Sequence, residues 1–250
     1  MFEFLPESLS IPEAALLVAL SGITSMLTAA VGIGGGVLLL AAMAQLLPVN
    51  ALIPVHGLVQ LGSNGSRAWL MRQYVDKSMV IYFGCGAILG ALIASSIVVQ
   101  LPLYWIQLSV ALFILYLVWG PKLYKHEVSS IGHVLAGAVT TVVSMFVGAT
   151  GPLVAGFVHR QRYSKFETTG TFAACMSLQH FLKMLVFTAI GFSFWQWLPM
   201  IILMILSGLV GTWVGLKLLN RVPEALFKQI YKVVVTLLAM RLLWQVMESL

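Results

Sequence analysis

The chain has 250 residues, of which 60% are hydrophobic and 9% are charged, and its formal net charge is +6 at pH 7. Soluble domains average about 25% charged residues, so this composition excludes an ordinary water-soluble domain and predicts an all-α protein that crosses the cell membrane several times. The basic residues stand at the ends of apolar segments rather than on one face, so we expect the lipid bilayer and no nucleic acid as a partner.

Apolar runs separated by polar residues, proline or glycine predict ten helical segments. In chain order these are about 13–31, 35–47, 52–71, 78–99, 103–119, 131–147, 153–162, 168–190, 195–218 and 226–246. A helix needs about 20 residues to cross the hydrocarbon core, so 35–47 and 153–162 are interpreted as half-helices. No Lys or Arg precedes the first segment, so we expect it to be retained rather than cleaved as a signal peptide.

Two glycine-rich breaks interrupt these segments at Gly32–Gly36 and Gly148–Pro152, at an offset of 116 residues. Glycine in a helix interior costs about 1 kcal/mol relative to alanine, so a cluster of this kind ends a helix. Unpaired backbone groups in hydrocarbon cost several kcal/mol each. We therefore expect each break to be covered by protein or to line a polar cavity.

The two halves of the chain repeat weakly but in order. The matching pairs are Gly32/Gly148, Gly35/Gly151, Asn64/His180 and Arg67/Lys183 at an offset of 116, and Gly90/Gly211 and Pro102/Pro223 at an offset of 121. Internal duplication is common in transporters. We predict a first repeat at 1–119 with its hairpin broken at 32–36, a cytoplasmic linker at 120–130, and a second repeat at 131–250 broken at 148–152.

The positions of Lys and Arg orient the predicted segments, because short basic loops face the cytoplasm. The loops predicted inside are 72–77, 120–130, 159–167 and 217–225; those predicted outside are the N-terminus, 48–51, 100–102, 191–194 and the C-terminus. The broken hairpin between 120–130 and 159–167 then enters and leaves from the cytoplasm. By analogy the first hairpin enters from outside, which makes two inverted repeats, each a broken-helix hairpin plus three membrane-spanning helices.

A half-helix that begins at a glycine turn presents free N–H groups and the positive end of its dipole, which together attract an anion. The residues predicted to bind an anion in this way are Gly34, Gly35, Gly36, Thr150 and Gly151. The alternative is close helix packing, which we favour for the two GxxxG pairs, Gly86/Gly90 and Gly211/Gly215.

Segments 52–71 and 168–190 carry polar residues that would be costly against lipid and are predicted to face the interior. They are His56, Gln60, Ser63, Asn64 and Arg67 on one face of the first segment, and Thr168, Thr169, Thr171, Ser177, Gln179, His180 and Lys183 in the second. Lys183 is the stronger candidate anion ligand, with Asn64, Gln179 and His180 as further ones. Arg67 either binds the anion or extends to the cytoplasmic surface. His56 and His180 either carry protons or pack in the core.

Several chemistries lack the residues they need. The one aspartate, Asp76, lies in a predicted loop, and no glutamate lies in the middle of a segment, which argues against an intramembrane aspartyl protease and against a cation site. No GxSxG or P-loop motif occurs, so we expect neither an enzyme nor ATP-driven transport by this chain alone. Cys85 and Cys175 both lie in apolar segments and have no metal-ligand spacing, so we expect no metal site and no cofactor.

The two breaks, together with Thr168-Thr169-Gly170-Thr171 leading to Lys183, resemble the TauE/SafE family of sulfite exporters over essentially the whole chain. The resemblance implies movement of sulfur-containing anions such as sulfite, sulfonates and related organic acids across the cytoplasmic membrane. His56 stands where a small or hydroxyl residue is usual, and His180 where an asparagine is common before the lysine. These departures leave the anion interpretation intact and the particular substrate open.

We therefore expect a secondary transporter that exports small sulfur-containing anions, each held at the midplane by the half-helix N-termini and Lys183. The alternatives are an anion channel and an uptake carrier for the same substrates. The sequence leaves a homo-oligomer open.

Overall fold

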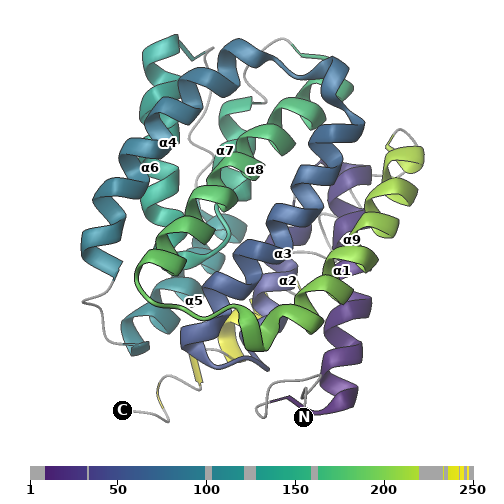
Figure 1. The fold of residues 1–250 in the computed structure, drawn as a ribbon, viewed down its shortest axis with the longest axis vertical. Helices are drawn as coiled ribbons and strands as arrows, with labels where there is room; N and C mark the ends of the chain where they lie inside the picture. Colours follow the sequence, from purple (N-terminus) through teal and green to yellow (C-terminus); the bar gives the residue numbers. More distant parts are fainter. Residues whose placement is uncertain are drawn as a thin grey trace.

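The structure is a computed structural model that describes residues 9–32, 34–98, 103–120, 128–158, 163–219 and, near the C-terminus, 233, 236–241, 243, 244 and 247. Within these ranges the chain forms a bundle of α-helices without a β-strand (Figure 1). Most of the predicted segment 226–246, of the linker 120–130 and of the loop 217–225 lies outside the described residues.

The described helices match the first nine predicted segments to within a few residues. They are α1 (Ile11–Val31), α2 (Gly35–Met43), α3 (Val49–Leu70), α4 (Lys77–Val98), α5 (Leu103–Trp119), α6 (Ser130–Val147), α7 (Gly151–Val158), α8 (Lys165–Ala189) and α9 (Leu198–Leu218). Serine residues cap α1, α6 and α8, and the caps of α1 and α8 are completed by a glutamate three residues later. The prediction of half-helices agrees with α2 and α7, which have 9 and 8 residues.

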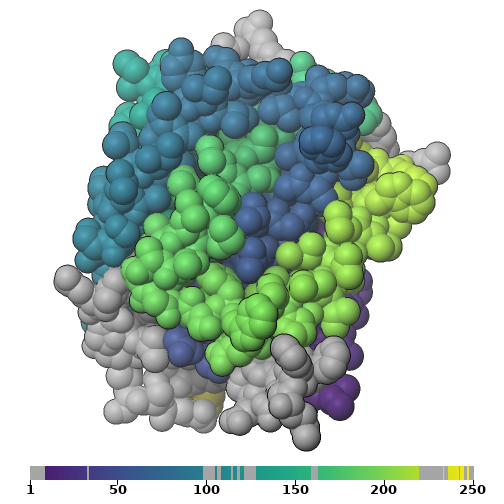
Figure 2. All heavy atoms as spheres, viewed as in Figure 1, coloured from purple at the N-terminus to yellow at the C-terminus, as the bar shows by residue number. Residues whose placement is uncertain are grey.

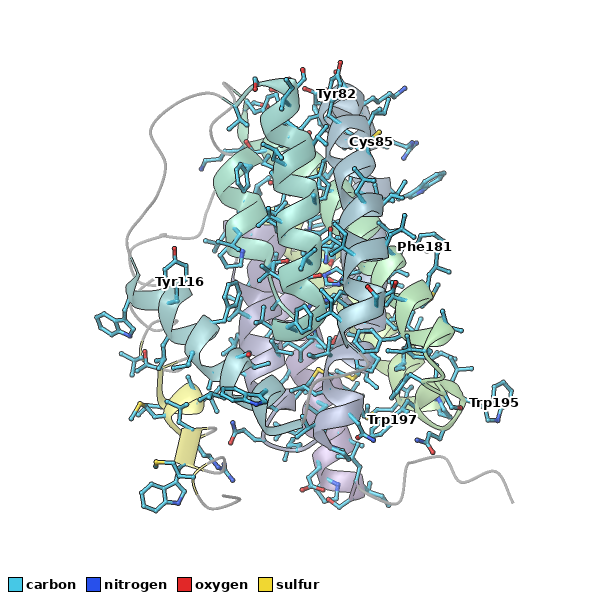
Figure 3. The ribbon with its side chains drawn as sticks, turned by 90° about the vertical axis from the view of Figure 1, so that its left-hand side faces the viewer. Tyr82, Cys85, Tyr116, Phe181, Trp195 and Trp197 are labelled. Atoms are coloured by element: carbon cyan, nitrogen blue, oxygen red, sulfur yellow. The ribbon has the colours of Figure 1, made fainter. Side chains whose placement is uncertain are left out.

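Five described helical stretches are long and apolar enough to cross a membrane: Ile11–Val31, Lys77–Ile97, Ser130–Val147, Lys165–Ala189 and Trp195–Leu218. On the face seen in Figure 2, α4, α8 and α9 lie at the surface together with part of α3. Leu92 of α4 and Val210 of α9 are among the exposed large apolar side chains. Tyr82 lies toward one end of the bundle and Trp195 toward the other (Figure 3), as expected of aromatic residues at the two membrane interfaces. The prediction of an all-α polytopic membrane protein is confirmed.

Glycine residues bring two pairs of helices into backbone contact. A Cβ on Gly211 of α9 would lie 2.0 Å from the Gly22 oxygen of α1, and one on Gly86 of α4 would lie 1.8 Å from the Val134 oxygen of α6. Gly90 and Gly215 make backbone contacts of the same kind. The close-packing interpretation of both GxxxG pairs is therefore confirmed.

Helices α3 and α8 cross the middle of the bundle in opposite directions (Figure 1). After the end of α3, the Asp76 N–H donates to Oγ1 of Thr171 near the start of α8, at 2.9 Å. Near the start of α3, the His56 ring lies 6.2 Å from the ring of His180, which is farther along α8. This reversed order is the one that inverted repeats require, although the equivalence of the two halves stays a prediction.

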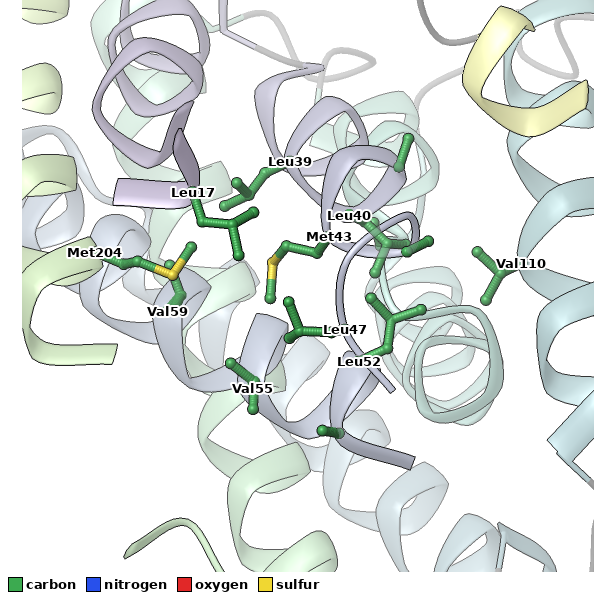
Figure 4. Close-up of a cluster of buried hydrophobic side chains, with 14 of the residues drawn as sticks. Leu17, Leu39, Leu40, Met43, Leu47, Leu52, Val55, Val59, Val110 and Met204 are labelled. Atoms are coloured by element: carbon green, nitrogen blue, oxygen red, sulfur yellow. The ribbon is translucent and has the colours of Figure 1, made fainter. Parts of the chain in front are cut away.

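Protein covers both half-helices, so their ends are not exposed to lipid. Leu39, Leu40 and Met43 of α2 are fully buried in a core that includes Leu17 of α1 and Val55 of α3 (Figure 4). In α7, Val154 and Val158 are buried in a second core cluster. Backbone at membrane depth is tolerated when it is enclosed in this way.

The backbone turns at the two breaks depend on glycine. Gly34, which precedes α2, has φ 103°, and Gly148, which follows α6, has φ 81°. L-residues with side chains rarely adopt such angles, whereas glycine does so at little steric cost. Each break is therefore encoded locally by a glycine with positive φ.

The contact between α1 and α9 predicts a specific cost for one added methyl group. In Gly211→Ala the new Cβ forces the two helices apart, so we expect a destabilisation of about 1–3 kcal/mol, measured by thermal unfolding in detergent. Gly65→Ala is the matched control, because a Cβ at Gly65 meets nothing within 4 Å. Equal melting temperatures for the two variants would contradict the packing described.

Candidate functional site

A small cavity lies between the two breaks at the centre of the bundle. The residues that line it are Thr28, Gly34, Gly36, Val37, His56, Gln60, Asn64, Ala149, Gly151, Pro152, Phe172, Met176 and His180. Its volume is about 20 Å³. That is room for about one ordered water.

Six residues predicted to bind the anion or to carry protons line this cavity: Gly34, Gly36, His56, Asn64, Gly151 and His180. Gln60 of the first polar segment and Pro152 of the second break line it as well. The cavity thus receives residues from both breaks and from both polar segments. Gly35 instead packs on α1, where a Cβ would lie 1.9 Å from the Thr24 oxygen. Arg67, Thr150, Gln179 and Lys183 are buried without lining the cavity.

Gln179 of α8 is joined to the start of α7 by one hydrogen bond and to α6 by two others. The Thr150 hydroxyl donates to its Oε1 at 2.7 Å, while its Nε2 donates to the hydroxyls of Thr140 and Thr141 at 3.1 and 3.2 Å. Leu153 and Val154 both donate to the Thr150 carbonyl, so Gly151 supplies the free amide of this turn. Gln179 therefore positions an amide that faces the cavity, without facing it itself.

Lys183 crosses from α8 to the second break. Its Nζ donates to the Gly148 carbonyl at 2.6 Å, and its side chain is 0% exposed. The stem passes so close to α3 that a Cβ on Gly57 would lie 2.8 Å from Lys183 Cδ. Gly148 caps the C-terminal end of α6, where a cation is favoured by the helix dipole.

The two histidines both line the cavity, and their rings form an edge-to-face pair with an interplanar angle of 77°. Nε2 of His56 lies 2.9 Å from the Gly36 carbonyl, and because a carbonyl only accepts, this nitrogen carries the hydrogen. Nδ1 of His56 and Nδ1 of His180 are buried without a hydrogen-bond partner. Buried polar atoms are rarely left unpaired, so these two nitrogens call for a polar partner.

Arg67 does not reach the surface. Its side chain is 1% exposed, Nη1 donates to Oδ1 of Asn64 at 3.1 Å, and Nη2 lies 3.4 Å from Oγ of Ser63. Ser63 in turn bonds Ser25 of α1 at 2.9 Å. Of the two alternatives raised by the sequence, extension to the cytoplasmic surface is therefore excluded in this conformation.

The cavity is electrostatically suited to an anion. Helices α2 and α7 begin at it, and the first N–H groups of a helix have no acceptor within the helix. Lys183 and Arg67 are buried nearby, and the lining residues include no carboxylate. Among the described residues, no group of three or more metal-ligating side chains was found.

A second polar cluster, which sequence reasoning missed, joins two loops at one end of the bundle. The Asp76 carboxylate accepts from the Tyr163 hydroxyl and from the Met79 N–H, the latter at 3.1 Å. Burial raises the pKa of Asp76, but hydrogen bonds from Tyr163 and from the backbone of Met79 and Ser78 outweigh it and hold the pKa below its ordinary value. Burial and the bond to Asp76 raise the pKa of Tyr163.

This cluster places residues 72–77 and 163–164 at the same end of the bundle, as the predicted topology requires.

The residues of the cavity lining that were not singled out in the sequence are Thr28, Val37, Ala149, Phe172 and Met176. Thr28 lies four residues before Gly32, in the last turn before the first break. A hydroxyl residue one helical turn before the glycine break was the one sequence signal that could have identified Thr28.

Comparison with known proteins identifies one family. The family model described as sulfite exporter TauE/SafE matches residues 17–242, which is nearly the whole chain. Neither a curated protein nor a solved structure matches the chain at a significant level.

The Asp76 cluster predicts an acid-dependent loss of stability. Because the folded pKa of Asp76 lies below the ordinary 3.8, its carboxylate stabilises the fold fully above about pH 4, and this contribution is lost as the pH falls through the folded pKa. Asp76→Asn should therefore be less stable than wild type at pH 7, by less than about 1 kcal/mol, and the difference should shrink in acid.

Thermal unfolding in detergent between pH 7 and pH 3 measures this difference. Tyr163→Phe is the matched variant, because loss of the phenol raises the pKa of Asp76 and should move the acid transition to a higher pH. A gap between wild type and Asp76→Asn that is constant with pH would contradict the assignment.

Proposed function

Because the chain belongs to the sulfite exporter TauE/SafE family of membrane transporters, we propose that it exports small sulfur-containing anions, such as sulfite, sulfonates or related organic acids, across the cytoplasmic membrane. The binding site in this proposal is the cavity between the two helix breaks. The observation that carries it is a cavity with polar and apolar side chains in its lining, at which two half-helices begin and whose lining includes no carboxylate.

The anion would be held mainly by fixed dipoles. The amides at the start of α2 and the Gly151 amide of α7 converge on the cavity from opposite breaks. Such groups attract an oxyanion without a formal charge and are aligned before it arrives. Lys183, whose Nζ reaches the Gly148 carbonyl, adds a cation beside the second break.

The size of the cavity is that of a closed site rather than of an open pore. A volume of about 20 Å³ admits about one water, so an anion of four or more heavy atoms enters only if the surrounding helices move. A transporter that must rearrange to admit its substrate exposes the binding site to one side of the membrane at a time. Breaks at corresponding positions of two repeats are the usual location of such a site.

The charge of the substrate favours export. Moving one negative charge out of a negative-inside cell is favourable by about 2.3 kcal/mol per 100 mV. Export of a monoanion therefore needs no coupling ion. Uptake of the same anion would need one, and His56 and His180, which both line the cavity, are the candidate proton carriers in that case.

Transport by the full chain in proteoliposomes tests the proposal. Wild type should move sulfite, methanesulfonate or a small carboxylate, and Lys183→Met should slow transport at least about tenfold, because charge-assisted hydrogen bonds contribute about 1.5–3 kcal/mol. Lys165→Met is the matched control, since Lys165 is an exposed cation at the start of the same helix. The proposal fails if none of these anions moves, or if Lys183→Met transports as wild type does.

Counterflow separates a carrier from a channel in the same vesicles. A carrier loaded with unlabelled anion should accumulate labelled anion transiently against its gradient, because each exchange is faster than an empty return. A channel gives no such stimulation.

A further inference from the structure

Arg67 is a buried charge for which the described residues provide no carboxylate. It is among the largest fully buried side chains, its Nε has no hydrogen-bond partner, and its bonds go to the neutral side chains of Asn64 and Ser63. Arginine stays protonated in proteins. An interior guanidinium paired only with neutral acceptors is costly, so its retention calls for a role.

The bonds of Arg67 run along α3 toward the cavity. Nη1 of Arg67 donates to Oδ1 of Asn64 at 3.1 Å, and Nδ2 of Asn64 donates to Oε1 of Gln60 at 3.1 Å. The guanidinium offers only donors, so the atom of Asn64 that faces it must be the oxygen. The Asn64 amide nitrogen then faces Gln60, which in turn must present its own oxygen.

The last side chain in this series of hydrogen bonds is Gln60, whose amide nitrogen has two free donors. Gln60 is 7% exposed and lines the cavity, and its Nε2 makes no hydrogen bond with the described protein. A Cβ on Gly36 would lie 3.3 Å from this nitrogen, so it sits beside the start of α2. The amide dipoles of Asn64 and Gln60 are thus aligned head to tail from Arg67 to the cavity.

We propose that Arg67 is a positioning residue for anion selectivity, which acts through Asn64 to hold the Nε2 donors of Gln60 toward an oxyanion in the cavity. This inference rests on the proposed function and adds how the site rejects uncharged molecules of similar shape. Aligned hydrogen bonds polarise one another in a low-dielectric interior, so the buried charge strengthens the donors that the anion meets. Arg67 itself does not touch the anion.

The choice of arginine follows from this role. A lysine has three donors on one rotating ammonium and does not enforce a planar, fixed acceptor partner, whereas the guanidinium fork does. Arginine also keeps its charge at every physiological pH, so the amides stay oriented whether or not the histidines are protonated. The second half has Lys183 at the matching position, where it contacts a backbone carbonyl and no amide side chain.

Binding of a matched pair of ligands to the purified full chain tests this role. Methanesulfonate is the anionic probe and dimethyl sulfone is its uncharged analogue. Arg67→Gln and Asn64→Leu should each raise the Kd for methanesulfonate at least about tenfold and leave binding of dimethyl sulfone unchanged or tighter. A purely structural role of Arg67 would weaken both ligands together and would overturn the proposal.

Asn64→Leu breaks the series of hydrogen bonds from Arg67 to Gln60 without removing the charge. It therefore tests the proposal even if Arg67→Gln fails to fold. Arg67→Lys should recover only part of the affinity for methanesulfonate. Arg72→Gln is the matched control, because Arg72 is an exposed arginine bonded to the Trp69 carbonyl and should bind both ligands as wild type does.

The outcomes separate the two proposals. Absence of anion binding and transport in wild type removes the proposed function. Transport in wild type, together with unaltered selectivity in Arg67→Gln and Asn64→Leu, contradicts only the proposed positioning role of Arg67.

Discussion

The structure depends on one constraint, which is that backbone polar groups at membrane depth need partners inside the protein. Two helices end in mid-bundle at glycine turns, and each resumes as a short helix whose first amides have no acceptor within the helix. Enclosure by α1, α3, α8 and α9 removes those amides from lipid. The cavity between the breaks leaves part of them available to a ligand, so the site is a direct result of how the breaks are enclosed.

The two buried cations contribute differently to the interior. Lys183 donates to a backbone carbonyl at the end of α6, an acceptor that any sequence supplies. Arg67 depends on the particular side chains of Asn64 and Gln60, since an amide side chain accepts from the guanidinium through its oxygen and donates onward through its nitrogen. The two matching positions of the chain therefore hold their charge in different ways.

The sequence was sufficient for the helices and the breaks, because glycine clusters and apolar runs are local signals. It gave the correct packing role to Gly211, since small residues four apart on an apolar helix favour close contact. The sequence did not decide whether the Arg67 side chain is buried or extends to the surface. That depends on how α1 packs against α3, where Ser25 bonds Ser63. The bond between Asp76 and Tyr163 joins residues 87 positions apart and has no local signature.

In the proposed transport cycle, the bond from Lys183 to the Gly148 carbonyl has a consequence for turnover. An anion that recruits the Lys183 ammonium must compete with an acceptor already 2.6 Å from it, so only the difference between the two bonds contributes to affinity. When the anion departed, the carbonyl would again accept a hydrogen bond from the lysine. An intramolecular acceptor of this kind would keep substrate affinity modest and shorten the residence time of the anion, which suits a transporter that must release its substrate.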